Sequence, residues 1–394
     1  MVLILPLIIL YIFSPGIERQ FYVNEIFSLF GFLIFISRFR RGSFPMYSII
    51  EKLMFILISY SIFHLLISYF IKDSLYIYLR HSVIVYSMFS FYLGDYLYRK
   101  KSLIIKYFKL FAFFTFITNS FAIIYSGMRT TIGLFFNAII TTNKSYNIIL
   151  YILLTIWAII IFHFSSTITF CFIIITILII FKSYKFFKIS ISLIFTGIIV
   201  SLILLDPIIQ DIYKSDTYFG GGKSSLLGTN IYLSTITGNL SLDNIIPRII
   251  LWHQVLIESF PKYLIGSGFG TIMWPYPNSI PFDPARGLDI WQNHIYLIGP
   301  HNSFITLLGR LGIISIIIII NIYRHLLKYF IHHFNLLIRN KDLIFFLTFF
   351  MMSAITFFNA VLESPLHASL FWITLGLTNH AYKVNKIINY YLEN

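Results

Sequence analysis

Apolar positions along the chain form long continuous runs that short polar or basic segments interrupt. A run of about 20 apolar residues is long enough to cross the hydrocarbon layer of a membrane as one helix. We expect crossings over the ranges 2–13, 21–37, 50–71, 80–97, 103–125, 130–142, 147–163, 167–181, 189–205, 302–322, 342–362 and 368–382. The pattern therefore predicts an all-α polytopic membrane protein with about twelve transmembrane helices.

Clusters of basic residues predict which side of the membrane each loop faces, because cytoplasmic loops carry an excess of lysine and arginine. The clusters are Arg38, Arg40 and Arg41; Arg99, Lys100 and Lys101; Lys182, Lys185 and Lys188; and Arg324, Lys328, Arg339 and Lys341. They all lie on one side only if the short run 130–142, which contains Asn137, also crosses. Both termini are then expected in the cytoplasm.

The same alternation divides the chain into three parts. Residues 1–205 hold about nine of the expected helices, residues 301–394 hold about three, and residues 206–300 form one large periplasmic loop. A loop of this length is usually functional or disordered. Its mixture of aromatic and turn-forming residues favours a folded cap over the helix bundle.

Composition excludes several other classes of protein. The chain has 394 residues, of which 58% are hydrophobic and 11% charged, and its mean hydropathy is +0.83. About a quarter of the residues in a soluble domain are charged, so soluble and disordered chains are excluded. Cys171 is the only cysteine, which excludes a disulfide scaffold. The net charge of +14 is explained by the basic loops, so no nucleic-acid partner is expected.

Chemistry on the outer face has to use a substrate that is already activated, because ATP and nucleotide sugars are not available there. The sequence contains no His-Glu-x-x-His, no paired cysteines and no Asp-x-Asp. These are the patterns that typically hold a catalytic metal ion. We therefore expect neither a metal nor another cofactor.

Two arginines and one histidine are the candidate catalytic residues. Arg129, at the outer end of the fifth expected helix, and Arg248, in the large loop, oppose the positive-inside trend and call for an anionic partner. Together they form a clamp that suits a diphosphate, because each guanidinium binds in a bidentate manner. His301, at the outer start of the helix expected over 302–322, can exchange a proton near neutral pH.

Further residues near these three are candidates for substrate binding. They supply an amide, an aromatic ring, a close backbone approach or a guanidinium group: Asn302, Trp252, Gly266, Gly268, Arg286 and Arg310. Arg310 lies roughly 13 Å below the outer face, at 1.5 Å per residue, where an arginine should face the bundle interior or a watery cavity. Its direction, turned about 180° from that of His301, argues against shared contact with one diphosphate.

At these residues the chain resembles the O-antigen polymerase and O-antigen ligase superfamily of bacterial membrane glycosyltransferases, which use undecaprenyl-diphosphate-linked glycans. The similar pattern is the pair His301–Asn302 followed after nine residues by Gly312, with Arg248, Trp252 and the Gly266–Gly268 pair upstream. An earlier element, Arg129 with Gly133 and Asn137, is also similar. The resemblance implies a GT-C-like fold in the bacterial inner membrane with a periplasmic active site.

The resemblance also implies a mechanism and a set of partners. An acceptor sugar hydroxyl attacks the anomeric carbon of the donor glycan with inversion, His301 is the general base, and Arg129 and Arg248 neutralise the diphosphate leaving group. The partners are the undecaprenyl-diphosphate-linked donor, a glycan or lipid A-core acceptor, the lipid bilayer and, optionally, a chain-length regulator. Ser315 favours a polymerase of O-antigen or capsular repeats over a ligase, since ligases often carry a further His or Thr there.

Several alternatives stay open. The ligase that transfers glycan to lipid A-core shares the histidine motif, and a transporter or flippase of the same lipid-linked glycan is the second alternative. A flippase is expected to place charged residues deep within several helices, and such charges are sparse in the sequence. Without the resemblance, His301 is better explained as a helix cap or as a partner of a loop carbonyl. Arg129 and Arg248, each taken alone, are equally well explained as side chains that reach lipid phosphates.

Overall fold

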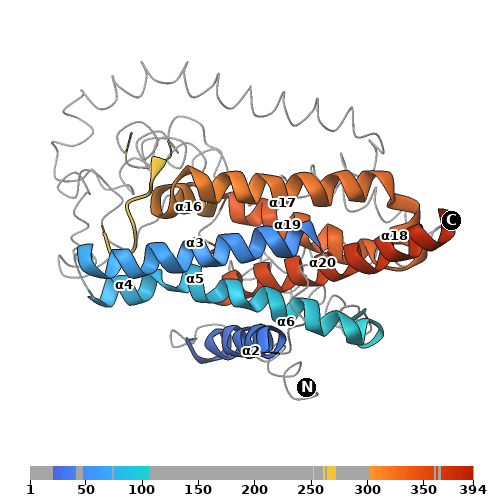
Figure 1. Ribbon diagram of the computed structural model, residues 1–394, viewed down its shortest axis with the longest axis horizontal. Coiled ribbons are helices and arrows are strands. Elements are labelled where there is room, and N and C mark those ends of the chain that lie inside the picture. Colours follow the sequence, from blue (N-terminus) through green and yellow to red (C-terminus); the bar gives the residue numbers. More distant parts are fainter. Residues whose placement is uncertain are drawn as a thin grey trace, which may run out of the picture.

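The structure, a computed structural model, describes residues 21–40, 48–72, 75–105, 252, 261, 264–271, 302–358, 361–362 and 365–393. Within these residues all regular structure is helical and no strand is present, which confirms the all-α prediction for this part of the chain. The helices lie side by side as a bundle (Figure 1). The large loop as a whole, and most residues of the expected spans between 103 and 205, lie outside the described residues.

The described helices overlap the expected apolar runs, except that residues 334–339 are helical between the runs 302–322 and 342–362. Their bounds are α2 (Phe21–Arg40), α3 (Ile49–Ile71), α4 (Leu75–His81), α5 (Val83–Tyr86), α6 (Ser90–Leu97), α16 (Ser303–Leu311), α17 (Ile313–His332), α18 (Phe334–Arg339), α19 (Leu343–Phe358) and α20 (Pro365–Glu393). Two short 3-10 turns, η1 (Ser87–Phe89) and η2 (Tyr98–Lys100), join α5 to α6 and continue α6.

Two of the described helices, α3 and α17, are long and apolar enough to cross a membrane by their length and composition. The start of α3 is set by Ser48, whose hydroxyl accepts a hydrogen bond from the Glu51 amide at 3.0 Å. This is the usual way in which a serine N-cap satisfies an amide that has no partner within the helix. The number of about twelve spans and the GT-C-like architecture stay predictions.

Two segments differ from their expected form. The run 302–322, expected as one helix, is broken at Gly312 into α16 and α17. The segment after α3, expected as a loop up to residue 79, forms α4, so helical structure starts at Leu75 and runs on through α6 to residue 105. The break at Gly312 depends on a positive φ of 77°, which apolar periodicity does not report.

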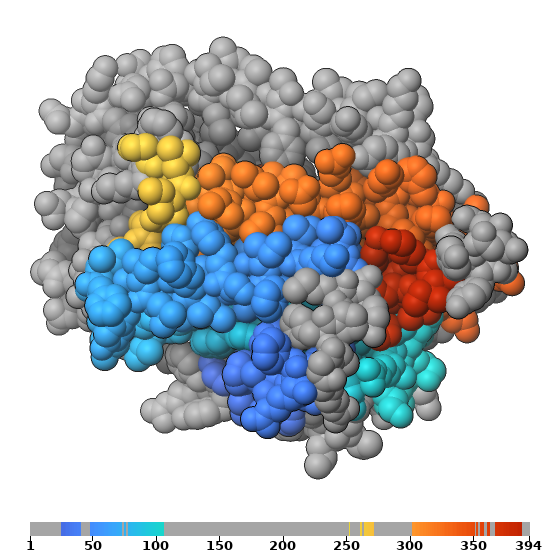
Figure 2. Space-filling model, in the orientation of Figure 1, coloured from blue at the N-terminus to red at the C-terminus, as the bar shows by residue number. Residues whose placement is uncertain are grey.

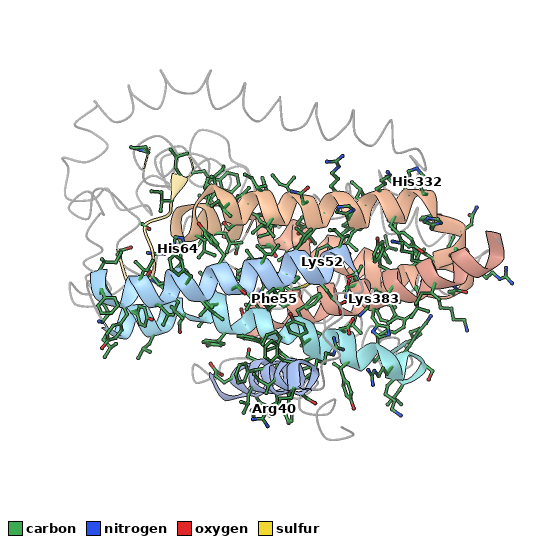
Figure 3. The ribbon with its side chains drawn as sticks, in the orientation of Figure 1. Arg40, Lys52, Phe55, His64, His332 and Lys383 are labelled. Carbon is green, nitrogen blue, oxygen red and sulfur yellow. The ribbon has the colours of Figure 1, made fainter. Side chains whose placement is uncertain are left out.

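The bundle has two distinct ends. At one end, which we call the glycine-loop end, residues 264–271 (the glycine loop, yellow in Figure 1) lie beside α16, α4 and the end of α3. The opposite end, which we call the ion-pair end, contains α18 and the last turns of α20. His64 on α3 lies toward the glycine-loop end, whereas Lys52 and His332 lie toward the ion-pair end (Figure 3).

Candidate functional site

The start of α16 carries the first candidate residues. Asn302 is its N-cap, and the Asn302 side-chain oxygen accepts hydrogen bonds from the amides of Phe304 (3.0 Å) and Ile305 (3.2 Å). The neighbouring Ser303 hydroxyl accepts a hydrogen bond of 3.0 Å from the Leu362 amide, which ties this end of α16 to the turn between α19 and α20. Asn302 therefore fixes the position at which the chain after His301 enters the bundle.

The other end of α16 is held by the glycine loop and by α3. The last four carbonyl groups of a helix have no partner within it, and burying them without one is costly. Here the Gly309 oxygen accepts from the Ser267 amide (2.7 Å) and hydroxyl (2.9 Å), and the Arg310 oxygen accepts from the Gly268 amide (3.1 Å). The Leu308 oxygen accepts from the Gly312 amide, and the Leu311 oxygen accepts from the Tyr60 hydroxyl at 2.7 Å. The last four carbonyl groups of α16 therefore all have hydrogen-bond partners at the break.

Gly266 and Gly312 allow the loop and the broken helix to meet. Both have a positive φ, 98° and 77°, which side chains other than glycine rarely tolerate. A methyl group on Gly266 would overlap the Arg310 carbonyl oxygen, and one on Gly312 would overlap the backbone of Ile265. The sequence predicted that Gly266 and Gly268 let the backbone approach a ligand closely. In the structure, Gly266 lies against the backbone of Arg310 in α16, and the Gly268 amide donates to the Arg310 oxygen.

Arg310 holds the glycine loop through hydrogen bonds from its guanidinium group. Its guanidinium Nη1 donates to the backbone oxygens of Gly268 (3.1 Å) and Thr271 (2.5 Å) and to the Thr271 hydroxyl (3.1 Å). Its Nη2 lies 3.5 Å from Nε2 of His81, whose Nδ1 accepts from the Gly270 amide at 3.2 Å. Arg310 is 3% exposed, so it faces the bundle interior as the sequence predicted. These contacts identify Arg310 as a residue that positions the loop.

Trp252 is the described candidate from the more distant part of the large loop. It is buried, and its ring meets Phe357 of α19 edge-to-face with centroids 5.6 Å apart. Phe357 in turn contacts Phe304 in the first turn of α16. The candidate residues that the structure describes therefore lie together. Asn302 and Arg310 belong to α16 or cap it, Gly266 and Gly268 contact it, and Trp252 reaches it through Phe357. His301, Arg248, Arg129 and Arg286 lie outside the described residues, so their roles stay predictions.

A polar stripe on α3 was not predicted from the sequence. Tyr60, His64 and Ser68 follow one another at a spacing of four, which places them on one face of the helix. Tyr60 binds the end of α16, and the Ser68 hydroxyl accepts from the Phe269 amide at 2.8 Å. The spacing of these polar residues within an apolar run is the sequence signal by which this face can be found.

A buried cluster of charges lies toward the ion-pair end. Asp95 of α6 is fully buried, and its carboxylate contacts Arg38 (2.5 Å), Lys383 (2.7 Å), His380 (3.2 Å) and the amide of Asn379 (3.2 Å). Lys383 also pairs with Glu51 of α3 at 2.8 Å. These contacts join α2, α3, α6 and α20 (Figure 3 shows Lys383 where these helices meet). The carboxylates of Asp95 and Glu51 balance the charges of Arg38 and Lys383.

A second cluster surrounds Asp342, just before α19. Its carboxylate accepts from Tyr98 (2.8 Å) and Asn385 (2.6 Å) and pairs with Lys101 (2.5 Å), which also donates to the Asn340 oxygen. Tyr98 stacks on His380 with centroids 4.6 Å apart, so the two clusters are continuous. Lys101 and Asn340 bring the basic segments 99–101 and 339–341 together at the ion-pair end.

The chain matches no protein-family model, no curated protein and no solved structure.

Proposed function

We propose that the protein is a membrane glycosyltransferase that polymerises O-antigen or capsular repeat units on the outer face of the bacterial inner membrane. The proposal starts from the sequence pattern of Arg129, Arg248, the glycine pair and His301–Asn302 through Gly312. The observation that supports it most is that the glycine pair and the segment before Gly312 lie in contact. Ser267 and Gly268 are hydrogen-bonded to Gly309 and Arg310, although about 40 positions separate them in sequence.

The arrangement of ends supports the expected sidedness. Lys101 lies at the ion-pair end, whereas Gly312, which ends α16, lies against the glycine loop. An odd number of crossings has to separate two points on opposite sides of a membrane. The apolar runs expected between them give an odd number only if 130–142 is one of them. The basic segments around Arg38, Lys101 and Asn340 then face the cytoplasm, and the glycine loop faces the periplasm.

In the proposed reaction the acceptor hydroxyl loses its proton to the imidazole of His301 as its oxygen bonds to the anomeric carbon. The bond from that carbon to the phosphate oxygen breaks, and undecaprenyl diphosphate leaves with the electron pair. Arg248 and Arg129 stabilise the negative charge that develops on the diphosphate. Asn302 and Arg310 contribute indirectly: Asn302 caps the helix that begins after His301, and Arg310 holds the glycine loop.

The ligase is the first alternative, because the same residues serve transfer to lipid A-core. The flippase is the second, and one observation favours it: the Asp95 cluster draws buried charges from α2, α3, α6 and α20. However, Asp95 lies only four residues, about 6 Å, before Arg99, near the expected inner boundary. The balanced charges and this shallow position are typical of a structural ion-pair network rather than a transport path.

A glycan gel of a strain that lacks the protein tests the proposal against its alternatives. A polymerase predicts a single repeat unit on lipid A-core, because ligation continues without chain extension. A ligase predicts bare core, and a flippase predicts repeats trapped on the cytoplasmic leaflet. Complementation with the wild-type chain has to restore the ladder, and an unchanged ladder in the deletion strain would contradict all of these functions.

A further inference from the structure

Three cations, which we call the cation cluster, lie close together on α17 and α20. The side chains of Arg324, Lys328 and Lys386 are exposed, and their charges all act on the imidazole of His325. Arg324 and Lys328 are four residues apart on α17, so their Cβ atoms are about 6 Å apart. Lys386 belongs to α20, which packs against α17 through an edge-to-face ring pair with centroids 4.7 Å apart. Two helices therefore bring the three charges to one place.

The cation cluster lacks the carboxylates that compensate other cations nearby. Lys383, three residues before Lys386 on α20, pairs with Asp95 at 2.7 Å and with Glu51 at 2.8 Å. By contrast, in the part of the chain that the structure describes, no hydrogen bond or ion pair joins any side chain of the cluster to another residue. Like charges this close repel one another, and a bound anion relieves that repulsion. The cluster is therefore suited to an anionic ligand from outside the chain.

The depth of the cluster follows from the contact between α3 and the end of α16. Tyr60 donates to the Leu311 oxygen, so these two residues lie at about one level of the bundle. From that level it is about 16 Å to the start of α3 at Ile49 and about 20 Å along α17 to Arg324, at 1.5 Å per residue. Both paths lead toward the ion-pair end (Figure 1), so Arg324 lies level with the start of α3. The basic segments at this end are expected to face the cytoplasm, which places the cluster at the inner membrane boundary.

An exposed apolar stripe on α17 leads up to the two cations of that helix. It consists of Ile313 (37% exposed), Ile317 (51%) and Ile320 (58%). A spacing of three or four residues places these side chains in line with Arg324 and Lys328 on one helix face. Figure 2 shows much of α17, in orange, uncovered on one face of the molecule. From Ile313 to Arg324 the face is about 16 Å long, close to the depth of one leaflet, which is half of about 30 Å.

We propose that this face of α17 binds an anionic phospholipid of the cytoplasmic leaflet. The lipid phosphate contacts Arg324, Lys328 and Lys386, and an acyl chain lies along the exposed isoleucines. Arg324 supplies a guanidinium fork and the two lysines supply point charges, a combination that suits phosphate oxygens. Along the helix the face is apolar over the depth of one leaflet and cationic at the membrane surface, which is the order of chemistry along such a lipid. Lipid binding here does not depend on the transfer reaction proposed for the candidate site.

Binding is measured on the full-length protein in phosphatidylcholine nanodiscs, with phosphatidylglycerol as the added probe and native mass spectrometry as the readout. We expect the double variant Arg324→Gln/Lys328→Gln to bind phosphatidylglycerol at least tenfold more weakly than the wild type. Lys386→Gln, on the other helix, should weaken binding at least threefold. Arg99→Gln/Lys100→Gln is the matched control, because it removes two exposed cations from the same end of the bundle, and its affinity should not change.

The acyl chain is tested with glycerol 3-phosphate, which carries a phosphate group and no hydrocarbon chain. The wild type should bind it at least tenfold more weakly than phosphatidylglycerol, because the exposed isoleucines of α17 then have no partner. Equal affinities for the two probes would show a site for a soluble anion and would overturn the lipid as its occupant.

Two further outcomes would overturn the site. An unchanged affinity of Arg324→Gln/Lys328→Gln for phosphatidylglycerol would show that these cations do not hold the lipid. An equal loss of affinity in the Arg99→Gln/Lys100→Gln control would show that only the total positive charge at this end matters. Circular dichroism of the variants checks that the helices are intact, and the glycan gel tests the transfer reaction independently of these results.

Discussion

The hydroxyl of Tyr60 donates a hydrogen bond of 2.7 Å to the backbone oxygen of Leu311, the last residue of α16. It joins the middle of one long helix to the point where another is broken. Two turns further along α3, Ser68 holds the Phe269 amide of the glycine loop. A single face of α3 therefore supports both the broken helix and the loop that contain the described candidate residues.

Removing the Tyr60 hydroxyl tests this support. Tyr60→Phe leaves the Leu311 oxygen without its donor, which should cost about 1 kcal/mol of unfolding free energy. The apparent melting temperature of the detergent-solubilised protein is the measurement. Tyr96→Phe is the control, because the Tyr96 ring is exposed and its hydroxyl makes no hydrogen bond in the described part of the chain. Equal melting temperatures for the two variants would show that the bond does not stabilise the break.

Replacing Arg310 should release the glycine loop. A lysine cannot reproduce the bonds that Nη1 makes to Gly268 and Thr271, so Arg310→Lys should behave almost as badly as Arg310→Gln. Hydrogen–deuterium exchange at the amides of Ser267 and Gly268 should increase at least tenfold in both variants, a difference of about 1.4 kcal/mol in opening. Unchanged exchange with lost glycan extension would instead show that Arg310 contacts the substrate.

Gly266 should tolerate no side chain. Gly266→Ala places a methyl group in the left-handed region, at a cost of about 1–2 kcal/mol, and against the Arg310 carbonyl oxygen. Folded yield and glycan extension should therefore fall together. Ser267→Ala, which removes only one hydroxyl bond to Gly309, should lose about 1 kcal/mol and keep most of its activity. A well-folded but inactive Gly266→Ala protein would point to a ligand at this position.

The Asp95 carboxylate should stabilise the fold, because it compensates the charges of Arg38 and Lys383. Asp95→Asn leaves Arg38 and Lys383 with less compensation in a buried place, and breaking such a pair costs about 3–5 kcal/mol. The double variant Asp95→Asn/Lys383→Met should recover a large part of that loss, because it also removes a cation. Melting temperatures of the single and double variants give the coupling. Strictly additive losses would show that the two side chains do not interact.

The sequence predicted the helices well and their interruptions poorly. Apolar runs located α2, α3, α19 and α20, because a helix of about 20 residues must be apolar to cross a membrane. The break at Gly312 was missed, because it depends on carbonyl partners from Ser267, Gly268 and Tyr60, which are distant in sequence. Apolar patterns do not report such contacts.

Contacts between residues distant in sequence also limited what could be predicted about the candidate site. That Arg310 faces the bundle interior was expected from the sequence and is seen in the structure, whereas its partners Gly268 and Thr271 did not follow from any local pattern. The buried charge cluster around Asp95 was not predicted either. Asp95 and Glu51 are each the one acidic residue in their apolar run. Only the packing of α2, α3, α6 and α20 brings their basic partners to them.

We expect glycosyl transfer to take place at the start of α16, with His301 as the base. Glycan gels of the deletion strain complemented with His301→Ala test it most directly, with His332→Ala as the control from the exposed, opposite end of α17. Loss of the base should lower the rate by about two to four orders of magnitude. The account predicts single repeats for His301→Ala and a normal ladder for His332→Ala, at equal protein levels in the membrane. A normal ladder from His301→Ala would contradict it.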